Sequence, residues 1–277
     1  IQTDITNNAA VIDINGDPAS SDLPENTKEF NFSKISCGDS HCYAIKNGQL
    51  FSVGSNSYGQ LGLGDNTNIN AWTSVTDMNN VTDIEAGSFF GYAIKDGELY
   101  SVGNNNYGQL GRGGLENNWG VVTGMTNTTR LAAGKEHAYA IKDGDLYSIG
   151  RNDYGQLGRA GTTHQATFEI VAGMSDLTEI AAGDYHGYAI KDGNLYSVGQ
   201  NWNGQLGREN KTNQSTWGVV AGMNNVTKVT AGSGFGYAVK DGDLYTVGQN
   251  IFGQLGRAGT TNQTTFEIVA GMNNVTD

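Results

Sequence analysis

The chain is built from one short cassette that occurs five times. The first motif of the cassette is Tyr-Ala-Ile-Lys-Asp-Gly or a close variant, and it begins at Tyr43, Tyr92, Tyr139, Tyr188 and Tyr237. The second motif is Gly-Gln-Leu-Gly, and it begins at Gly59, Gly108, Gly155, Gly204 and Gly253. In both series the copies lie 49, 47, 49 and 49 residues apart. A fixed period of this length is typical of solenoids, propellers and arrays, because one unit cannot bury its apolar face alone.

The fourth copy shows how one unit is expected to fold. Residues 177–182 alternate between apolar and polar side chains, and further strand-like segments cover 187–191, 194–199 and 216–221. Asp192-Gly193 separates the second segment from the third, and Asp-Gly between alternating strands favours a two-residue hairpin turn. Four short antiparallel strands in a unit of this size predict one blade of a β-propeller, and no helical period competes. We therefore expect an all-β fold with four-stranded antiparallel blades.

Four further motifs recur in fixed order. They are a Gly-x-x-His before the second strand, as in 38–41, the Lys-Asp-Gly hairpin, Leu-Tyr-Ser-x-Gly in the third strand and Asn-x-Tyr-Gly-Gln-Leu-Gly. With these motifs the repeats resemble the regulator of chromosome condensation repeat family. The resemblance covers roughly residues 30–277. Members of this family typically form seven-bladed propellers. They include a guanine-nucleotide exchange factor, the bacterial β-lactamase inhibitor protein II, and bacterial and phage interaction proteins.

This resemblance and the repeat pattern together define the expected domains. Residues 1–29 form an N-terminal extension or linker, and residues 30–277 form the propeller. The closing residues 273–277 repeat residues 79–83, so they are expected to begin a further repeat. Two arrangements stay open: a five-bladed ring, or part of a seven-bladed ring whose remainder is missing.

Composition and motifs argue against several functions. The formal net charge is −12 with no local basic patch, which disfavours nucleic acid and anionic membranes, and no apolar run is long enough for a membrane span. No Cys/His cluster has metal spacing, and no nucleophile elbow, Walker loop or dinucleotide fingerprint occurs. We expect no enzyme activity, no metal and no cofactor. Nucleotide exchange is also disfavoured, because family exchange factors use an inserted element and these repeats have none.

Two kinds of loop should emerge at the same end of every blade, and they differ between copies. They are the short loop between the first and second strands and the long loop between the third and fourth. Variation on exposed loops favours a binding surface, and Tyr, Trp and Phe beside polar groups are typical of interface hot spots. The candidate partner-binding residues are Asp39, Ser88, Phe89, Lys135, Glu136, Asp184 and Tyr185 in short loops, and Tyr58, Tyr107, Tyr154, Trp202 and Phe252 in long loops.

Each long-loop aromatic has a second interpretation, which is packing onto the next blade, and we prefer it because these rings recur in register. The short-loop residues are then the better binding candidates. An arginine follows four of the Gly-Gln-Leu-Gly motifs, at Arg112, Arg159, Arg208 and Arg257. We expect these guanidinium groups to satisfy loop carbonyls or a carboxylate, and the alternative is a ring of cations for an anionic ligand.

The histidines of the repeat are expected to be structural. They are His41, His137 and His186, and two copies have Phe90 and Phe235 in their place. A shared catalytic or metal site would not tolerate that replacement. His164 fits no pattern.

Cys37 and Cys42 flank a tight loop, so a short disulfide is geometrically possible, but we expect free buried thiols. The cellular compartment is therefore open on this evidence. The acidic, Asn/Thr/Gly-rich composition favours an extracellular or virion-surface setting.

The sequence thus predicts a non-enzymatic propeller whose variable loops bind a protein or a cell-surface glycan. The alternatives are a lectin-like or adhesin module and an enzyme inhibitor of the β-lactamase inhibitor type.

Overall fold

The computed structural model describes residues 32–114 and 116–276 of the chain. The chain divides into two units, residues 1–31 and residues 32–277, and the description below concerns the second unit. The extension expected at residues 1–29 lies outside the described residues. Among the described residues there is no helix long and apolar enough to cross a membrane.

Five four-stranded sheets make up the described unit, and each sheet is one blade. The first strands of blades one to five are β1 (Phe32–Cys37), β5 (Val81–Ala86), β9 (Thr128–Ala133), β13 (Leu177–Ala182) and β17 (Val226–Ala231). The second strands are β2 (His41–Lys46), β6 (Phe90–Lys95), β10 (His137–Lys142), β14 (His186–Lys191) and β18 (Phe235–Lys240). The third strands are β3 (Gln49–Gly54), β7 (Glu98–Gly103), β11 (Asp145–Gly150), β15 (Asn194–Gly199) and β19 (Asp243–Gly248). The fourth strands are β4 (Ile69–Ser74), β8 (Glu116–Thr126), β12 (Gln165–Ser175), β16 (Gln214–Val219) and β20 (Gln263–Ile268).

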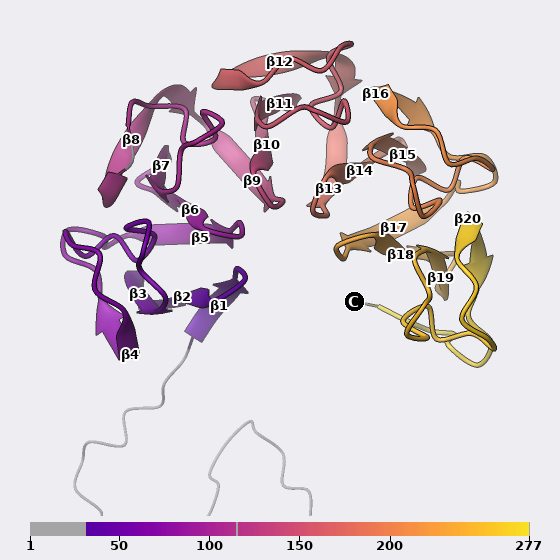
Figure 1. Cartoon of the computed structure of the whole chain (residues 1–277), viewed down its shortest axis with the longest axis horizontal. Coiled ribbons are helices and arrows are strands. Elements are labelled where there is room, and N and C mark those ends of the chain that lie inside the picture. Colours follow the sequence, from indigo (N-terminus) through magenta and orange to yellow (C-terminus); the bar gives the residue numbers. More distant parts are fainter. Residues whose placement is uncertain (1–31, 115, 277) are drawn as a thin grey trace, which may run out of the picture. The chain divides into compact units, whose positions relative to one another are not determined.

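Strand order within each blade follows chain order, and every pairing is antiparallel. The first strands of successive blades contact one another, so β1, β5, β9, β13 and β17 line the inside of an arc of blades (Figure 1). This is the all-β propeller architecture that the repeat predicts.

Turn chemistry explains why each unit forms this sheet. Asp192 and Gly193 have φ angles of 49° and 72°, the left-handed conformation that a two-residue hairpin requires, and Asp and Gly tolerate it best. The expected strand boundaries hold for 177–182 and 194–199. The fourth strand of this blade begins at Gln214, two residues earlier than predicted, because Gln214 pairs with Gly199 at the end of β15.

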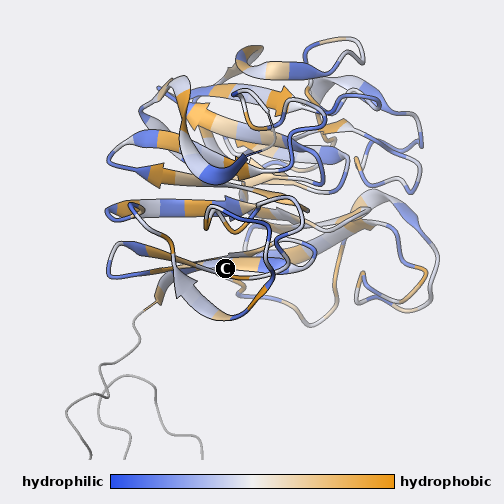
Figure 2. Ribbon diagram, turned by 60° about the vertical axis from the view of Figure 1, so that its left-hand side comes forward, coloured by the Kyte–Doolittle hydropathy of each residue, from blue (hydrophilic) through white to orange (hydrophobic). Residues whose placement is uncertain are grey.

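The hydrophobic core lies between blades. One buried cluster joins Tyr92, Ile94 and Leu99 of blade two with Leu131 and Ala140 of blade three, and similar clusters lie between the other neighbours. In Figure 2, hydrophobic segments, coloured orange, lie along the strands. A single blade therefore presents half of a core, which is why the cassette must be repeated.

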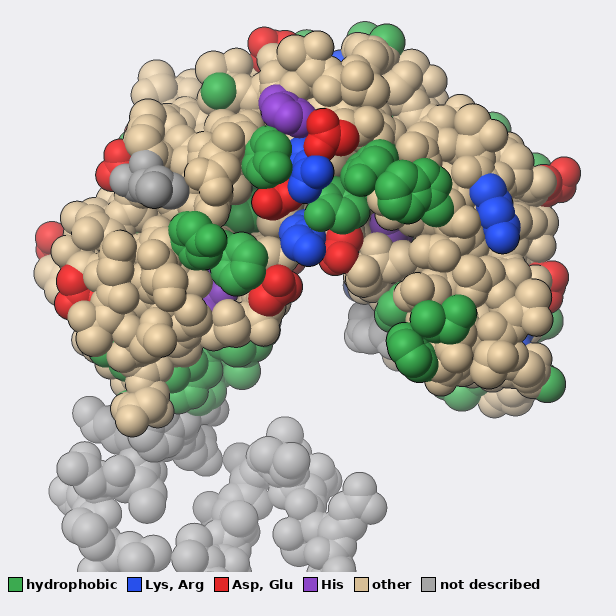
Figure 3. All heavy atoms as spheres, in the orientation of Figure 1, with side chains coloured by type: hydrophobic (Ala, Val, Ile, Leu, Met, Phe, Trp, Pro, Cys, Tyr) green, Lys and Arg blue, Asp and Glu red, His purple; other side chains and the backbone are tan. Residues whose placement is uncertain are grey.

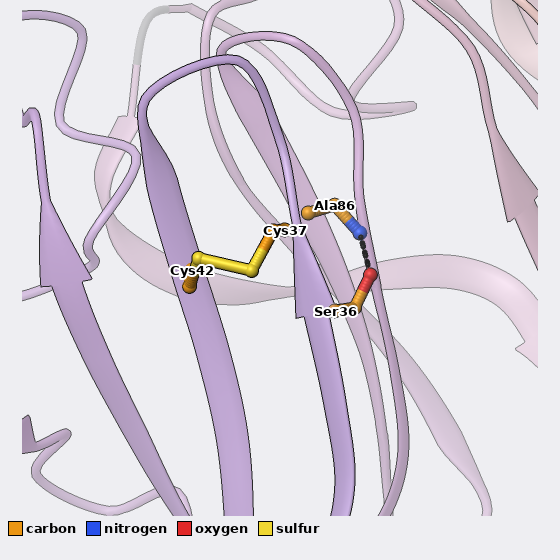
Figure 4. Close-up of a disulfide and its surroundings, with 4 residues drawn as sticks. All are labelled: Ser36, Cys37, Cys42 and Ala86. Carbon is orange, nitrogen blue, oxygen red and sulfur yellow. Dashed lines mark hydrogen bonds between the residues drawn. A yellow bond between two sulfur atoms is a disulfide. The ribbon is translucent and has the colours of Figure 1, made fainter. Parts of the chain in front are cut away.

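The cysteines form a disulfide, so the expectation of free thiols was wrong. The antiparallel register of β1 and β2 places Cys37 directly opposite Cys42, with 4.1 Å between their Cα atoms. Figure 4 shows the bridge at the end of this strand pair, where the Ser36 hydroxyl accepts a hydrogen bond of 2.9 Å from the Ala86 amide of blade two. The two cysteines are therefore a cross-strand pair, which the sequence analysis had treated only as residues beside a short loop.

Candidate binding site on the loop face

The short and long loops meet at one end of each blade, which we call the loop face. Backbone hydrogen bonds join the two loops: the Ser55 amide donates to the Ser40 carbonyl at 2.8 Å, and the Gln200 amide donates to the Tyr185 carbonyl at 2.9 Å. At the opposite end, the Val81 amide donates to Gly48 of the hairpin turn at 2.9 Å. The expected division of the loops between two ends is therefore correct.

The long loops are held rigidly by the Gly-Gln-Leu-Gly motif. In blade three, Gln156 and Leu157 are fully buried, and the side-chain oxygen of Asn152 accepts from the Leu157 amide at 2.9 Å. The Gln156 side-chain oxygen accepts from the Tyr154 amide at 3.0 Å, and the buried Tyr139 hydroxyl donates to the Gln156 carbonyl. The backbone that carries the Tyr154 ring is therefore fixed to the blade beneath it.

An arginine occupies the middle of the loop face. The Arg151 guanidinium carbon lies 4.9 Å from the ring centroid of Tyr107 and 5.0 Å from that of Tyr185, which are cation–π distances. Its nitrogens also contact the Glu136 carboxylate at 2.6 Å and the Asp153 carboxylate at 2.5 Å. These five residues, contributed by blades two, three and four, are called the arginine cluster below.

Further aromatic and basic side chains extend the arginine cluster. The Tyr154 ring stands edge-on to Tyr185 and to Trp202, with centroids 5.2 and 5.0 Å apart. Trp202 is 57% exposed, and the Lys135 ammonium lies 5.8 Å from the Tyr185 ring centroid. Figure 3 looks onto this face and shows hydrophobic, basic, acidic and histidine side chains gathered at its centre. Such a patch combines apolar area with fixed charges.

Electrostatics keep the cluster in defined charge states. Burial opposes the charge of Arg151, but hydrogen bonds to Glu136 and Asp153 outweigh it and raise the pKa of the guanidinium. Burial raises the pKa of Tyr185, against the lowering effect of Lys135 and Arg151. The cluster thus presents the neutral phenol of Tyr185 beside a permanently charged guanidinium that is already paired.

The structure divides the sequence-predicted residues into three groups. The arginine cluster and its extension bring together Tyr107, Lys135, Glu136, Tyr154, Tyr185 and Trp202, with Asp184 beside them through its carbonyl, which accepts from the Lys135 amide at 3.2 Å. Over blades one and two, the Tyr58 and Phe89 rings lie 5.3 Å apart, and the Ser88 hydroxyl donates to Asp39 at 3.0 Å. Phe252 in blade five is 85% exposed and stands apart from both groups.

The long-loop aromatics behave mostly as the packing interpretation predicts. Tyr58, Tyr107 and Tyr154 each contact a side chain on a loop of the next blade. They nonetheless remain at the surface of the loop face, and Tyr58 is 39% exposed. These tyrosine rings can therefore pack against the next blade and still be accessible to a binding partner.

Sequence reasoning missed Arg151, Asp153 and His164. Aligned copies could have revealed Arg151, because it follows the last Gly of the third strand, where the other copies have Ser55, Asn104, Gln200 and Gln249. His164 replaces an asparagine: its Nδ1 accepts from the Asn152 amide at 3.0 Å, just as the Asn213 side chain accepts from Asn201 at 2.9 Å. The imidazole also reaches Tyr107, with centroids 4.9 Å apart.

The arginines after Gly-Gln-Leu-Gly are structural, as expected. Arg112 donates to the carbonyls of Ser101 and Asn118 at 2.6 and 2.7 Å, and Arg159 pairs with the Glu169 carboxylate at 2.6 Å. Arg208 and Arg257 make equivalent contacts. In the described part of the chain, no group of three or more His, Cys, Asp or Glu side chains is placed to hold a metal ion.

The family model of the RCC1-like domain matches residues 15–277. The sequence match and the propeller fold therefore indicate the same class of repeat protein. The chain belongs to the RCC1-like domain family. No sequence among the curated proteins compared with it is similar enough to count as a match.

Solved structures share the fold at low sequence identity. Human WBSCR16 is 22% identical with a TM-score of 0.79, over 89% of this chain and 69% of that one. Prp20p from Saccharomyces cerevisiae, described with its binding to Gsp1p and histones, is 20% identical with a TM-score of 0.76, over 87% of this chain and 64% of that one. Yeast RCC1 (Prp20) bound to Kap60 is 17% identical with a TM-score of 0.64, over 88% and 76%. The chain thus spans about two thirds of the length of the first two proteins.

Proposed function

We propose that this chain is a non-enzymatic binding propeller that recognises a protein partner through the arginine cluster and the aromatic rings beside it. The observation that carries the proposal is the position of Arg151 between two tyrosine rings and two carboxylates on the loop face. Interface hot spots are rich in Tyr, Trp and Arg, and they need side chains that are already ordered before binding.

The loop anchoring supports the same proposal. A partner meets a Tyr154 ring whose backbone is held by the buried Gln156, and a Trp202 ring that stands edge-on to Tyr154, so little side-chain entropy is lost on association. Because Arg151 is paired with Glu136 and Asp153, positive and negative charges lie close together on this surface. They favour a partner that offers groups of both signs, or polar groups, at matching positions. They do not favour a strongly charged polymer, and the net charge of −12 agrees with this.

A capture experiment tests the proposal. The bait is the whole chain, compared with the double variant Tyr154→Ala/Trp202→Ala and with Lys142→Ala, which lies near the hairpin turn at the opposite end of blade three. Proteins retained by the native chain and by Lys142→Ala should be lost with the double variant. Equal retention by all three folded baits would refute the assignment of this face.

The disulfide favours a second candidate function, which is recognition at a cell or virion surface. Disulfides such as Cys37–Cys42 persist mainly in oxidising compartments, and the exposed Trp202 and Phe252 rings offer stacking surfaces for sugars. Binding of labelled protein to a glycan array tests this candidate. Hits that share a terminal sugar and disappear with Trp202→Ala would support it, whereas an array without hits from folded protein would leave the protein partner as the better account.

A further inference from the structure

The long loops of blades one, three, four and five share one backbone anchor. In blades one, four and five, the amide of an asparagine near the start of the loop donates to the side-chain oxygen of a second asparagine. The pairs are Asn56–Asn68, Asn201–Asn213 and Asn250–Asn262, with donor–acceptor distances of 2.7 to 2.9 Å. Blade three makes the same bond with a histidine, because the Asn152 amide donates to His164 Nδ1 at 3.0 Å. The anchor of this loop therefore has a different acceptor.

The anchor in blade three fixes the backbone at the centre of the arginine cluster. Asn152 lies between Arg151 and Asp153 in the sequence, so a hydrogen bond to its amide holds the chain that carries both charged side chains. The buried Asn152 side chain accepts from the Leu157 amide at 2.9 Å, which ties the same backbone to the blade. His164 therefore influences the positions of Arg151 and Asp153 through the residue between them.

The His164 ring lies among charged groups and is open to solvent. Its Nε2 is 3.6 Å from the Asp153 carboxylate, and the side chain is 39% exposed. Asp153 also accepts from Arg151 at 2.5 Å, and Arg151 pairs with Glu136. On the blade-two side the ring stands edge-on to the Tyr107 phenol. The Asp153 carboxylate favours a charged imidazole, whereas the Arg151 cation opposes it.

Histidine and asparagine differ as acceptors when the pH changes. The side-chain oxygen of asparagine accepts a hydrogen bond at any pH, whereas histidine Nδ1 accepts only in the neutral ring that carries its proton on Nε2. A second proton turns Nδ1 of His164 into a donor that faces the N–H of Asn152, and two donors cannot bond to each other. Histidine is the side chain whose charge ordinarily changes between about pH 5 and 8.

We propose that His164 is a pH-sensitive positioning residue for the arginine cluster. The neutral ring holds the Asn152 amide and keeps Arg151 and Asp153 in place, and the protonated ring releases that amide. The consequence for binding rests on the proposed function: the partner is held near neutral pH and released in mild acid.

The first test measures amide hydrogen exchange by NMR at pH 7.5 and pH 5.5. The Asn201 amide of blade four is the reference within the same chain, because its acceptor is the Asn213 side chain. In the native chain, protection of the Asn152 amide relative to Asn201 should fall at least about fivefold at the lower pH, as the loss of one hydrogen bond predicts. In His164→Asn, which supplies the acceptor used in the other blades, this ratio should stay constant.

Acid also acts on the buried histidines, but their effect on the whole unit reaches both amides and both proteins alike. A ratio that does not change with pH in the native chain would overturn the proposal. An equal fall in His164→Asn would overturn it as well, because the cause would then lie outside the imidazole.

The second test repeats the capture experiment at the two pH values with the native chain and His164→Asn as folded baits. Retention by the native chain should fall at pH 5.5 by at least about fivefold, whereas retention by the variant, whatever its level at pH 7.5, should not. Equal retention at both pH values by the native chain, or an equal fall for both baits, contradicts the regulation. If no protein is captured at either pH, the proposed function fails, and the exchange ratio still decides the role of His164.

Discussion

The three buried histidines should make the folded protein sensitive to mild acid. Their rings are buried and stand edge-on to the tyrosine two residues further along each strand. The histidines are His41, His137 and His186. The chain supplies a matched replacement, because Phe90 and Phe235 occupy the same place in blades two and five with the same edge-on contact.

Burial lowers the pKa of His41 and His186 to about 4 and that of His137 to about 3. The folded-state pKa lies below the unfolded value of about 6.5, so the folded state favours the neutral ring. Stability is complete above pH 6.5 and is lost as the pH falls towards 4. At pH 5 each ring costs about 2 kcal/mol of folding free energy relative to pH 8, or about 6 kcal/mol for three. Domains are stable by about 5–15 kcal/mol, so this loss is large.

Urea denaturation at pH 8 and pH 5 measures the effect. The native chain is compared with the triple variant His41→Phe/His137→Phe/His186→Phe. Burial raises the pKa of Glu85 to about 7, which favours folding at acid pH in both proteins and so cancels in the comparison. The native chain should lose about 6 kcal/mol more than the variant between the two pH values. Equal losses would refute the reasoning that these rings are buried in neutral form.

Three further results are expected. Replacing both Cys37 and Cys42 with alanine should lower the free energy of unfolding by about 2 kcal/mol, because the bridge closes a short loop in the unfolded chain, and chemical denaturation with and without a reductant measures it. Gly187→Val should destabilise by at least about 2 kcal/mol, because its side chain would collide with the Tyr139 ring, whereas Gly113→Ala, with nothing near it, should be neutral in the same thermal melts. Arg151→Met should lower the melting temperature by no more than about 4 °C, since its ion pairs with Glu136 and Asp153 lie in partly exposed loops and contribute about 1 kcal/mol, yet it should abolish capture of the partner.

The sequence predicted the blade because its information is local and repeated. The spacing of Tyr43 and its copies, together with the Asp-Gly turns, is enough to define strand order and the end from which each loop emerges. Cys37 and Cys42 are the last pair of residues in the ladder between β1 and β2. The residue at which this ladder ends cannot be read from the repeat, so the disulfide was not predicted.

The binding surface was predicted only in part, for a related reason. Candidate residues were chosen for expected exposure and for variation between copies, which identified Tyr107 and Tyr185 on separate blades. Their meeting point, Arg151, depends on how neighbouring blades are placed in space, and a single copy contains no such information. His164 was overlooked because another copy has an asparagine at the corresponding position, Asn213. The two residues are equivalent only in the hydrogen bond that each side chain accepts from a backbone amide.

The third residues of the inner strands alternate in charge from blade one to blade five, at Lys34, Asp83, Arg130, Glu179 and Lys228. This alternation has a consequence for how such an array can change in length. Loss of one blade would bring two cations or two anions side by side, for example Lys34 and Arg130 if blade two were deleted. Loss of two adjacent blades keeps opposite signs together. Blades two and four share Trp-Gly-Val-Val, and blades three and five share Thr-Phe-Glu-Ile-Val. A pair of adjacent blades with opposite inner charges is therefore the unit whose gain or loss keeps opposite charges side by side along the inner strands.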